Sequence, residues 1–127
     1  MSFLSLARSS LGGLIIGWIF AHMSFAIPVK RLRETDTLLA FYHPKPSYPV
    51  HILLVPKRAI GSLMELSSND MDFYADLVQT VQSLVAEFDL EARGYRLVVN
   101  GGEYQEVGQL HSHLISAEMP KQEDDIK

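Results

Sequence analysis

The chain has 127 residues and a formal net charge of −4, from 11 basic and 15 acidic residues. This length suits a single domain, and the excess of acidic residues argues against the basic surface that a nucleic-acid-binding protein needs. The sequence has no cysteine, which excludes disulfides, thiol nucleophiles and cysteine-based metal centres. We therefore expect one packed domain without a nucleic-acid partner.

An uncharged, largely apolar segment lies near the start of the chain. No residue between Ser9 and Val29 carries a formal charge, and as a helix this stretch would be about 31 Å long, close to the thickness of a bilayer core. Three alternatives fit this segment: a membrane anchor, a first helix packed into the domain, or a cleaved signal peptide. The basic residues Lys30, Arg31 and Arg33 follow it, which favours a cytoplasmic location for the domain by the positive-inside rule.

Short strands are expected next. Val29–Glu34 alternates between apolar and charged residues, and Leu38–Tyr42 is a second apolar run. The stretch His43–Pro49 contains three prolines, which predicts a loop. Val50–Val55 is apolar and partly β-branched, which is typical of a central strand.

A long helix is predicted after this strand. Ser67 and Ser68 are candidate N-caps, and Asp70 and Asp72 fall in the first turn, where negative charge suits the helix dipole. Apolar residues at helical spacing form one stripe that most simply faces the core. This predicted stripe consists of Tyr74, Val78, Val81, Val85 and Phe88.

Two further strands complete the prediction, at Tyr95–Asn100 and at Gln109–Ser116. Strands separated by one long helix predict an α+β fold, with an antiparallel meander and the helix on one face. We accordingly divide the chain into an apolar N-terminal segment at 1–28 (membrane anchor or first helix), a domain at 29–118 and a polar tail at 119–127.

The last predicted strand contains the residues best suited to chemistry. Side chains alternate along a strand, so Gln109, His111 and His113 are expected to share one face. Spacing alone leaves three interpretations open: partly exposed histidines without a role, catalytic histidines, or a zinc site. A zinc site would need a third ligand, and His43 or His51 could supply it only if the fold brings it close.

Ordered motifs in this chain resemble those of a known family. They are IPVK at 27–30, PVHILLVPK at 49–57, GYRLVVN at 94–100 and QEVGQLHSH at 105–113. With these motifs the chain resembles the histidine-triad (HIT) family of nucleotide hydrolases and transferases, most closely its Hint-like nucleoside phosphoramidase branch. The resemblance covers about residues 19–116. It implies an α+β fold with a five-stranded antiparallel sheet, a homodimer in which two sheets join, and a purine nucleotide bound in a cleft of each subunit.

The resemblance also implies a role for each matching residue. His111 is the expected nucleophile, which attacks the α-phosphorus to form a nucleotidyl-histidine that water then hydrolyses. Neutral imidazole is available for this attack near neutral pH, and a backbone carbonyl of the same strand is expected to bind its other ring nitrogen. No metal and no cofactor is expected. The expected phosphate or nucleotide contacts are His43, Asn100, Gln105, Glu106, Gln109 and His113, with Phe20 and Phe41 in the base pocket and His51 in a supporting role.

Three positions depart from the family pattern. Gln109 replaces the first histidine of the triad, Glu106 stands where near relatives have a small hydroxyl residue, and His43 replaces an acidic residue that holds the ribose hydroxyls. A carboxylate aimed at a phosphate would repel it, and a histidine cannot accept hydrogen bonds as a carboxylate does. Two hypotheses follow: a HIT-type hydrolase or nucleotidyl transferase (a phosphoramidase or a dinucleoside polyphosphate hydrolase), or a catalytically weakened HIT-like binding module. In either case the apolar residues 9–29 could anchor the protein to a membrane.

Overall fold

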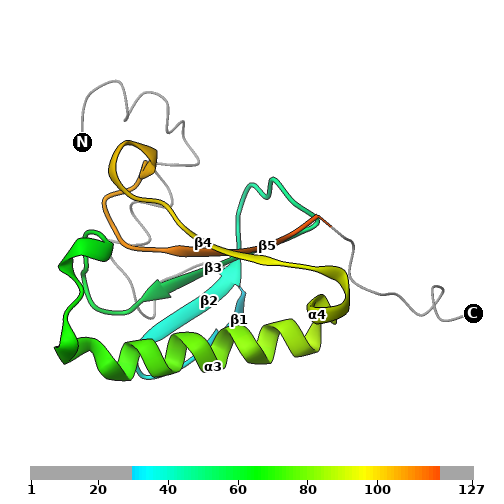
Figure 1. The fold of residues 1–127 in the computed structure, drawn as a ribbon, viewed down its shortest axis with the longest axis horizontal. Coiled ribbons are helices and arrows are strands. Elements are labelled where there is room, and N and C mark those ends of the chain that lie inside the picture. The colour runs from blue at the N-terminus through cyan, green and yellow to red at the C-terminus, as the bar shows by residue number, and fades with distance from the viewer. Residues whose placement is uncertain (1–29, 118–127) are drawn as a thin grey trace, which may run out of the picture.

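The structure, a computed structural model, describes residues 30–117 and arranges them around an antiparallel sheet (Figure 1). The five strands are β1 (Arg31–Glu34), β2 (Leu38–Tyr42), β3 (Val50–Pro56), β4 (Arg96–Val99) and β5 (Ser112–Ser116). This confirms the predicted α+β class and the five-stranded antiparallel sheet.

The strand order differs from the predicted meander. It is β1-β2-β3-β5-β4, so the last strand lies between β3 and β4. The meander was wrong because the helix after β3 carries the chain across the sheet, so that β4 lies at the edge and not next to β3 (Figure 1). Strand β5 then occupies the place between β3 and β4. As a result β5, with His113, is a central strand with a neighbour on each side.

Two α-helices and three short 3-10 turns connect the strands. The helices are α3 (Met71–Glu87) and α4 (Leu90–Arg93), and the turns are η1 (Leu63–Glu65), η2 (Ser68–Asp70) and η3 (Gly102–Tyr104). Ser67 is a cap, as predicted, because its hydroxyl accepts a hydrogen bond from the Asn69 N–H. In return the Asp70 carboxylate accepts one from the Ser67 N–H at 2.9 Å. The capped element is η2, which leads directly into α3.

The buried stripe of α3 is displaced from the predicted one. Val81 and Val85 are buried as expected, but Val78 is 54% exposed. Leu84, which the prediction left out, is completely buried. Neighbouring residues on a helix lie about 100° apart, so the centre of the buried face falls near Leu77, Val81 and Leu84 rather than at Val78.

The sheet has two different faces. The helix face is an apolar core in which α3 and α4 pack against alternate residues of the strands. This core consists of Ala40, Val50, Ile52, Leu54, Val81, Leu84, Val85, Leu90 and Leu114. The opposite side, which we call the histidine face, has two rows of directly paired residues across the strands. One row is Phe41, Leu53, His113 and Val98, and the other is His51, Ile115 and Arg96.

The predicted apolar segment 1–28, the anchor at 9–29 and the polar tail at 119–127 lie outside the described residues. Within residues 30–117, no helix has both the length and the apolar character that crossing a membrane requires.

Candidate active site

The strand that carries the histidines is shorter than predicted. Strand β5 begins at Ser112 rather than at Gln109, so His111 immediately precedes it. The reason is a competing hydrogen bond, because the Leu110 N–H donates to the Ile60 carbonyl at 2.7 Å and not to a neighbouring strand. His111 therefore lies at the point where a loop enters the sheet.

The ring of His111 is oriented by the backbone. Its Nδ1 lies 2.8 Å from the carbonyl oxygen of Gln109. A carbonyl can only accept, so Nδ1 carries the proton and the lone pair of the neutral ring is on Nε2. Burial lowers the pKa of His111 below its usual value, and the Gln109 carbonyl opposes this only in part. The ring is thus a neutral imidazole with Nε2 as its nucleophilic atom at neutral pH.

A chain of hydrogen bonds fixes the other two histidines of the sheet. The Ser47 N–H donates to Nδ1 of His51 at 3.1 Å, so the neutral His51 ring carries its proton on Nε2. That Nε2 lies 2.9 Å from Nδ1 of His113 and donates to it. The proton of His113 is then on Nε2, a buried atom with no hydrogen-bond partner among the residues that the structure describes. His113 therefore presents an N–H donor that is ready for an acceptor oxygen.

Four imidazoles form one cluster, which we call the histidine cluster: His43, His51, His111 and His113. Ring centroids are 4.4 Å apart for His43 and His51, 5.2 Å for His51 and His113, and 4.9 Å for His111 and His113. Burial, followed by repulsion between the rings, lowers the pKa of His51 to about 4 and that of His113 to about 3. The cluster is consequently uncharged at neutral pH.

His43 joins this cluster although the sequence places it in a loop. Its Nδ1 accepts a hydrogen bond from the Lys45 N–H at 2.9 Å, which leaves the ring proton on Nε2. Its backbone N–H donates to the His51 carbonyl at 2.9 Å, which extends the pairing of β2 with β3 beyond Tyr42. Burial lowers the pKa of His43, and its neutral ring offers one N–H donor beside His113.

The two glutamines of the candidate site bind backbone carbonyls. The Gln109 amide nitrogen donates to the Arg58 carbonyl at 3.2 Å. The Gln105 amide nitrogen donates to the Gly61 carbonyl at 2.6 Å and to the Val107 carbonyl at 2.9 Å. Both amide hydrogens of Gln105 are thereby engaged. These side chains hold together the loops on which His111 depends.

The remaining predicted site residues lie in different environments. Asn100 is half-buried at the end of β4, and Glu106 is exposed in the loop before β5. Phe41 is only 1% exposed and lies on the histidine face, two strands away from His113. Phe20 lies outside the described residues.

The zinc alternative lacks a third ligand in this part of the chain. Among residues 30–117, no three side chains of His, Asp or Glu are placed so that they could hold a metal ion together. Four imidazoles are close together, but Nε2 of His51 and Nδ1 of His113 form a hydrogen bond with each other. These two nitrogens are therefore not turned toward a common metal position.

Sequence reasoning missed two contributors to the site, both in the proline-rich loop before β3. The Ser47 N–H sets the tautomer of His51, and the ring of Tyr48 stands edge-on to the His51 ring at 5.5 Å. A backbone donor leaves no trace in residue type, and a tyrosine in a loop has no periodic pattern to mark it. The position of the loop next to a predicted central strand was the only available signal.

Comparisons with known proteins agree with this arrangement. The model of the HIT domain family matches residues 24–119. An uncharacterized HIT-like protein of Synechococcus elongatus is 38% identical over 91 residues, which cover 70% of this chain and 79% of that protein. A HIT family hydrolase from Legionella pneumophila is 27% identical with a TM-score of 0.70, covering 85% of this chain and 96% of that one. A histidine triad nucleotide-binding protein from Candida albicans is 26% identical with a TM-score of 0.65, covering 79% and 71%.

Proposed function

The chain belongs to the HIT domain family, and from this premise we propose that it is a nucleotide hydrolase or nucleotidyl transferase with His111 as nucleophile. The family supplies a hydrolase-like, nucleotide-binding fold. One observation carries the choice of nucleophile: the Gln109 carbonyl, 2.8 Å from Nδ1 of His111, puts the lone pair on Nε2. The role of Gln109 here belongs to its backbone, so the loss of a histidine side chain at this position does not remove it.

In the proposed reaction, Nε2 of His111 attacks the α-phosphorus of a purine nucleotide conjugate. A P–Nε2 bond forms, and the bond from phosphorus to the leaving group breaks. The leaving group departs with the bonding electron pair and takes up a proton from the solvent. Water then attacks the same phosphorus, loses a proton to the solvent and breaks the P–Nε2 bond, which releases the nucleoside monophosphate and restores the neutral ring. Throughout, Nδ1 keeps its proton and its bond to the carbonyl.

His113 is proposed to bind an oxygen of the phosphate being transferred. Its Nε2–H is buried and has no acceptor among residues 30–117, and leaving a buried donor unbonded costs about 1–3 kcal/mol. A phosphate oxygen would satisfy it. The nearby ring of His43 offers a second N–H donor to the same nucleotide.

Within the family we propose the Hint-like phosphoramidase branch, whose substrate has a phosphorus–nitrogen bond. The motifs at 49–57, 94–100 and 105–113 support this choice. The exposed position of Glu106 also supports turnover, because a solvated carboxylate repels a bound phosphate much less than one pointing into the site.

The rival function is a HIT-like module that binds a nucleotide or another partner without turnover. One observation favours it: Gln105 uses both amide hydrogens on backbone carbonyls, so this side chain has none left for a phosphate. Binding without catalysis would follow if the remaining donors hold the nucleotide away from the line of attack.

Trapping the intermediate separates the two functions. The full-length chain would be mixed with a nucleoside phosphoramidate, quenched, and measured as intact mass and as fragments. We expect the mass of one nucleotidyl group on His111, its absence in His111→Ala, and its presence in the control Lys57→Gln, which changes a surface ion pair with Glu34. A wild-type chain that binds the nucleotide but never forms the adduct would establish the binding module instead.

We also propose that two copies join through β4. This strand is at the edge of the sheet, and Leu97 and Val99 in it and Tyr95 just before it are exposed, at 42%, 37% and 46%. An unprotected apolar edge strand is a template for pairing with a second strand. Light scattering on the full-length chain would give the mass of a dimer, and the mass of a monomer at micromolar concentration would contradict this.

Membrane association remains a proposal that rests on sequence alone. The uncharged residues 9–29 and the basic residues after them would anchor the protein with its domain in the cytoplasm. Fractionation after a carbonate wash should leave the full-length chain with the membranes and release a chain that begins at Ile27. Release of both would contradict the anchor.

A further inference from the structure

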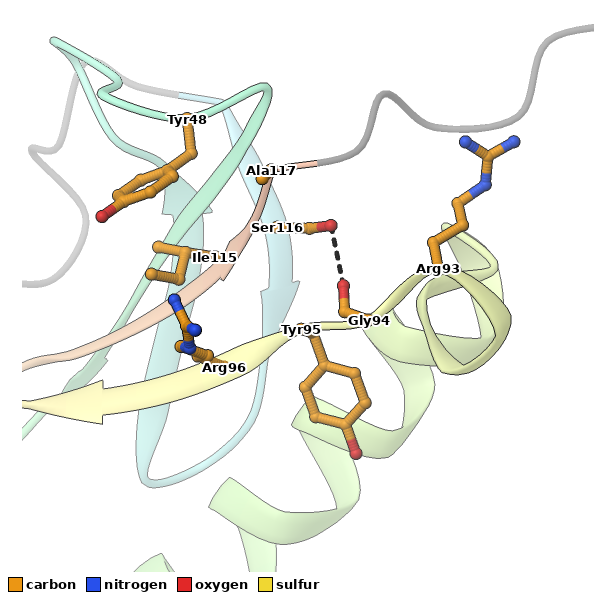
Figure 2. A pocket seen from close by; sticks show the side chains of 8 residues that line it. All are labelled: Tyr48, Arg93, Gly94, Tyr95, Arg96, Ile115, Ser116 and Ala117. Atoms are coloured by element: carbon orange, nitrogen blue, oxygen red, sulfur yellow. Dashed lines mark hydrogen bonds between the residues drawn. The ribbon is translucent and has the colours of Figure 1, made fainter.

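A separate hollow lies at the far end of β5 from His111. Figure 2 shows the residues that line it. Its volume is about 290 Å³, near the lower end of the range for sites that bind small molecules. The part of its lining that matters most consists of Tyr48, Arg93, Gly94, Arg96, Ile115 and Ser116. The hollow is therefore formed by the loop before β3, the turn between α4 and β4, and the end of β5.

The hollow is positively charged in a chain that is acidic overall. Arg93 and Arg96 line it, and the described lining residues include no Asp or Glu. Arg96 is exposed and forms no ion pair with any residue in the range 30–117. Arg93 forms an ion pair with Asp89 at 3.9 Å. Two guanidinium groups beside one hollow make a local positive potential that attracts anions.

The backbone turn between these two arginines is anchored to the sheet. Gly94 has a φ of +101°, a conformation that favours glycine, and this turn separates Arg93 on α4 from Arg96 on β4. The Ser116 hydroxyl donates to the Gly94 carbonyl at 2.8 Å and so ties the turn to the end of β5 (Figure 2). The backbone that carries both arginines is therefore anchored to the end of the sheet.

The hollow also adjoins the histidine cluster. Arg96, Ile115 and His51 are directly paired across neighbouring strands and share the histidine face. Ile115 follows His113 by two residues, about 7 Å along the strand. Figure 2 shows Tyr48 and Arg96 on either side of Ile115, with the ring of Tyr95 pointing away from them, and the Tyr48 ring also contacts His51. A ligand in the hollow would therefore lie next to His51, at the edge of the histidine cluster.

We propose that this hollow binds a small organic anion, a carboxylate or a phosphate ester with an apolar body. Arginine forks match the geometry of both anionic groups, while Ile115 and the ring of Tyr48 provide an apolar wall for the body. The same chemistry has two possible sources. It is either a separate effector molecule or the far end of the leaving group of a substrate bound at His111, and the second source rests on the function proposed above.

Binding is tested first, without any turnover. The full-length chain would be titrated with benzoate, and with benzamide as its neutral counterpart, while NMR follows the amide signals of Gly94 and Ala117. We expect benzoate to bind more tightly than benzamide, and Arg96→Gln to weaken benzoate at least about tenfold, because a hydrogen bond to a charged group is lost. Lys57→Gln also removes one positive charge, but Lys57 follows the end of β3 that is far from the hollow. This control should bind benzoate like the wild type.

Three results would overturn the proposal. These are equal binding of benzoate and benzamide, undiminished binding by Arg96→Gln, and binding that appears only when residues 118–127 are removed. The last result would make the chain's own acidic tail the occupant of the hollow. Arg96→Lys guards against a folding artefact, since it keeps the charge and should bind benzoate with intermediate affinity.

Turnover then identifies the source of the anion. Two nucleoside phosphoramidates would be compared whose amines end in a carboxylate or in the matching neutral amide. A higher kcat/KM for the carboxylate that is lost in Arg96→Gln assigns the hollow to the leaving group. Equal kcat/KM values, with benzoate still binding, assign it to an effector. If neither compound reacts, the proposed hydrolase function fails while the titration still decides whether the anion site exists.

Discussion

The two faces of the sheet are packed according to different physical requirements. On the helix face, Leu84 and Leu114 are completely buried against α3 and the strands, and burying each such side chain contributes about 1.5–3 kcal/mol. On the histidine face, His51 and His113 are imidazoles whose burial is unfavourable unless their nitrogens are hydrogen-bonded. One face therefore stabilises the fold, and the other uses that rigidity to hold polar groups in a defined arrangement.

The apolar part of the histidine face explains why its rings stay neutral. Phe41 and Leu53 are 1% exposed and lie in the same cross-strand row as His113. An apolar floor removes water from the rings and disfavours their charged form, which is the main reason for the lowered pKa of His113. Both faces therefore have apolar residues, and they differ in that only the histidine face holds buried, hydrogen-bonded imidazoles among them.

The largest expected effect is a loss of activity, with little loss of stability, when His111 is replaced. His111→Ala should reduce transfer of the nucleotidyl group by about 10⁴-fold or more, because the attacking atom is removed. The free energy of unfolding should change little, since the half-buried ring is not one of the residues of the helix-face core. Single-turnover kinetics and urea unfolding measure the two quantities. Comparable transfer by the variant would show that another group is the nucleophile.

The second effect is a loss of stability, with activity retained, when a residue of the helix face is replaced. Leu84→Ala should lower the free energy of unfolding by about 2–5 kcal/mol, because it leaves a cavity between α3 and the sheet. Below its melting temperature the variant should still form the adduct on His111. Urea unfolding gives the stability, and Val78→Ala, at an exposed position on the same helix, is the matched control. Similar losses in both variants would contradict the observed stripe of α3.

The third effect is acid sensitivity that originates on the histidine face. Unfolded histidines bind protons below about pH 6.5, whereas folded His51 and His113 resist until about pH 4 and about pH 3. Stability should be complete above pH 6.5 and should fall as the pH decreases, by up to about 1.4 kcal/mol per pH unit for each such histidine. Unfolding measured between pH 7 and pH 4.5 tests this. His113→Gln should have a shallower dependence, and an unchanged slope would show that His113 is not responsible.

The smallest effect concerns Gln109, where the side chain and the backbone have different tasks. Gln109→Leu removes the amide bond to the Arg58 carbonyl, so the free energy of unfolding should fall by about 1 kcal/mol. The backbone carbonyl that orients His111 remains, so adduct formation should fall far less than in His111→Ala. Parallel rate and unfolding measurements check both parts. A loss as large as that of His111→Ala would mean that the amide itself contacts the substrate.

Local patterns predicted some parts of this fold better than others. The apolar run that begins at Val50 and the cap at Ser67 were identified correctly, because strand propensity and capping act within a few residues. The stripe of α3 was displaced at Val78, since adjacent stripes of a helix can both contain apolar residues and only packing selects one. The start of β5 was also misplaced, because the Leu110 bond to Ile60 spans 50 positions in the sequence.

The sequence by itself determined the elements, their composition and the family: five strands, one long helix, and histidines at positions 111 and 113 within a recognisable set of motifs. Only the tertiary structure decided which nitrogen of each ring carries the proton, that the His43 ring lies 4.4 Å from the His51 ring, and that Arg93, Arg96 and Tyr48 line one hollow. The physical reason is range. Propensity and periodicity act between near neighbours in the chain, whereas tautomers, pKa values and pockets depend on atoms that the sheet brings together from distant segments.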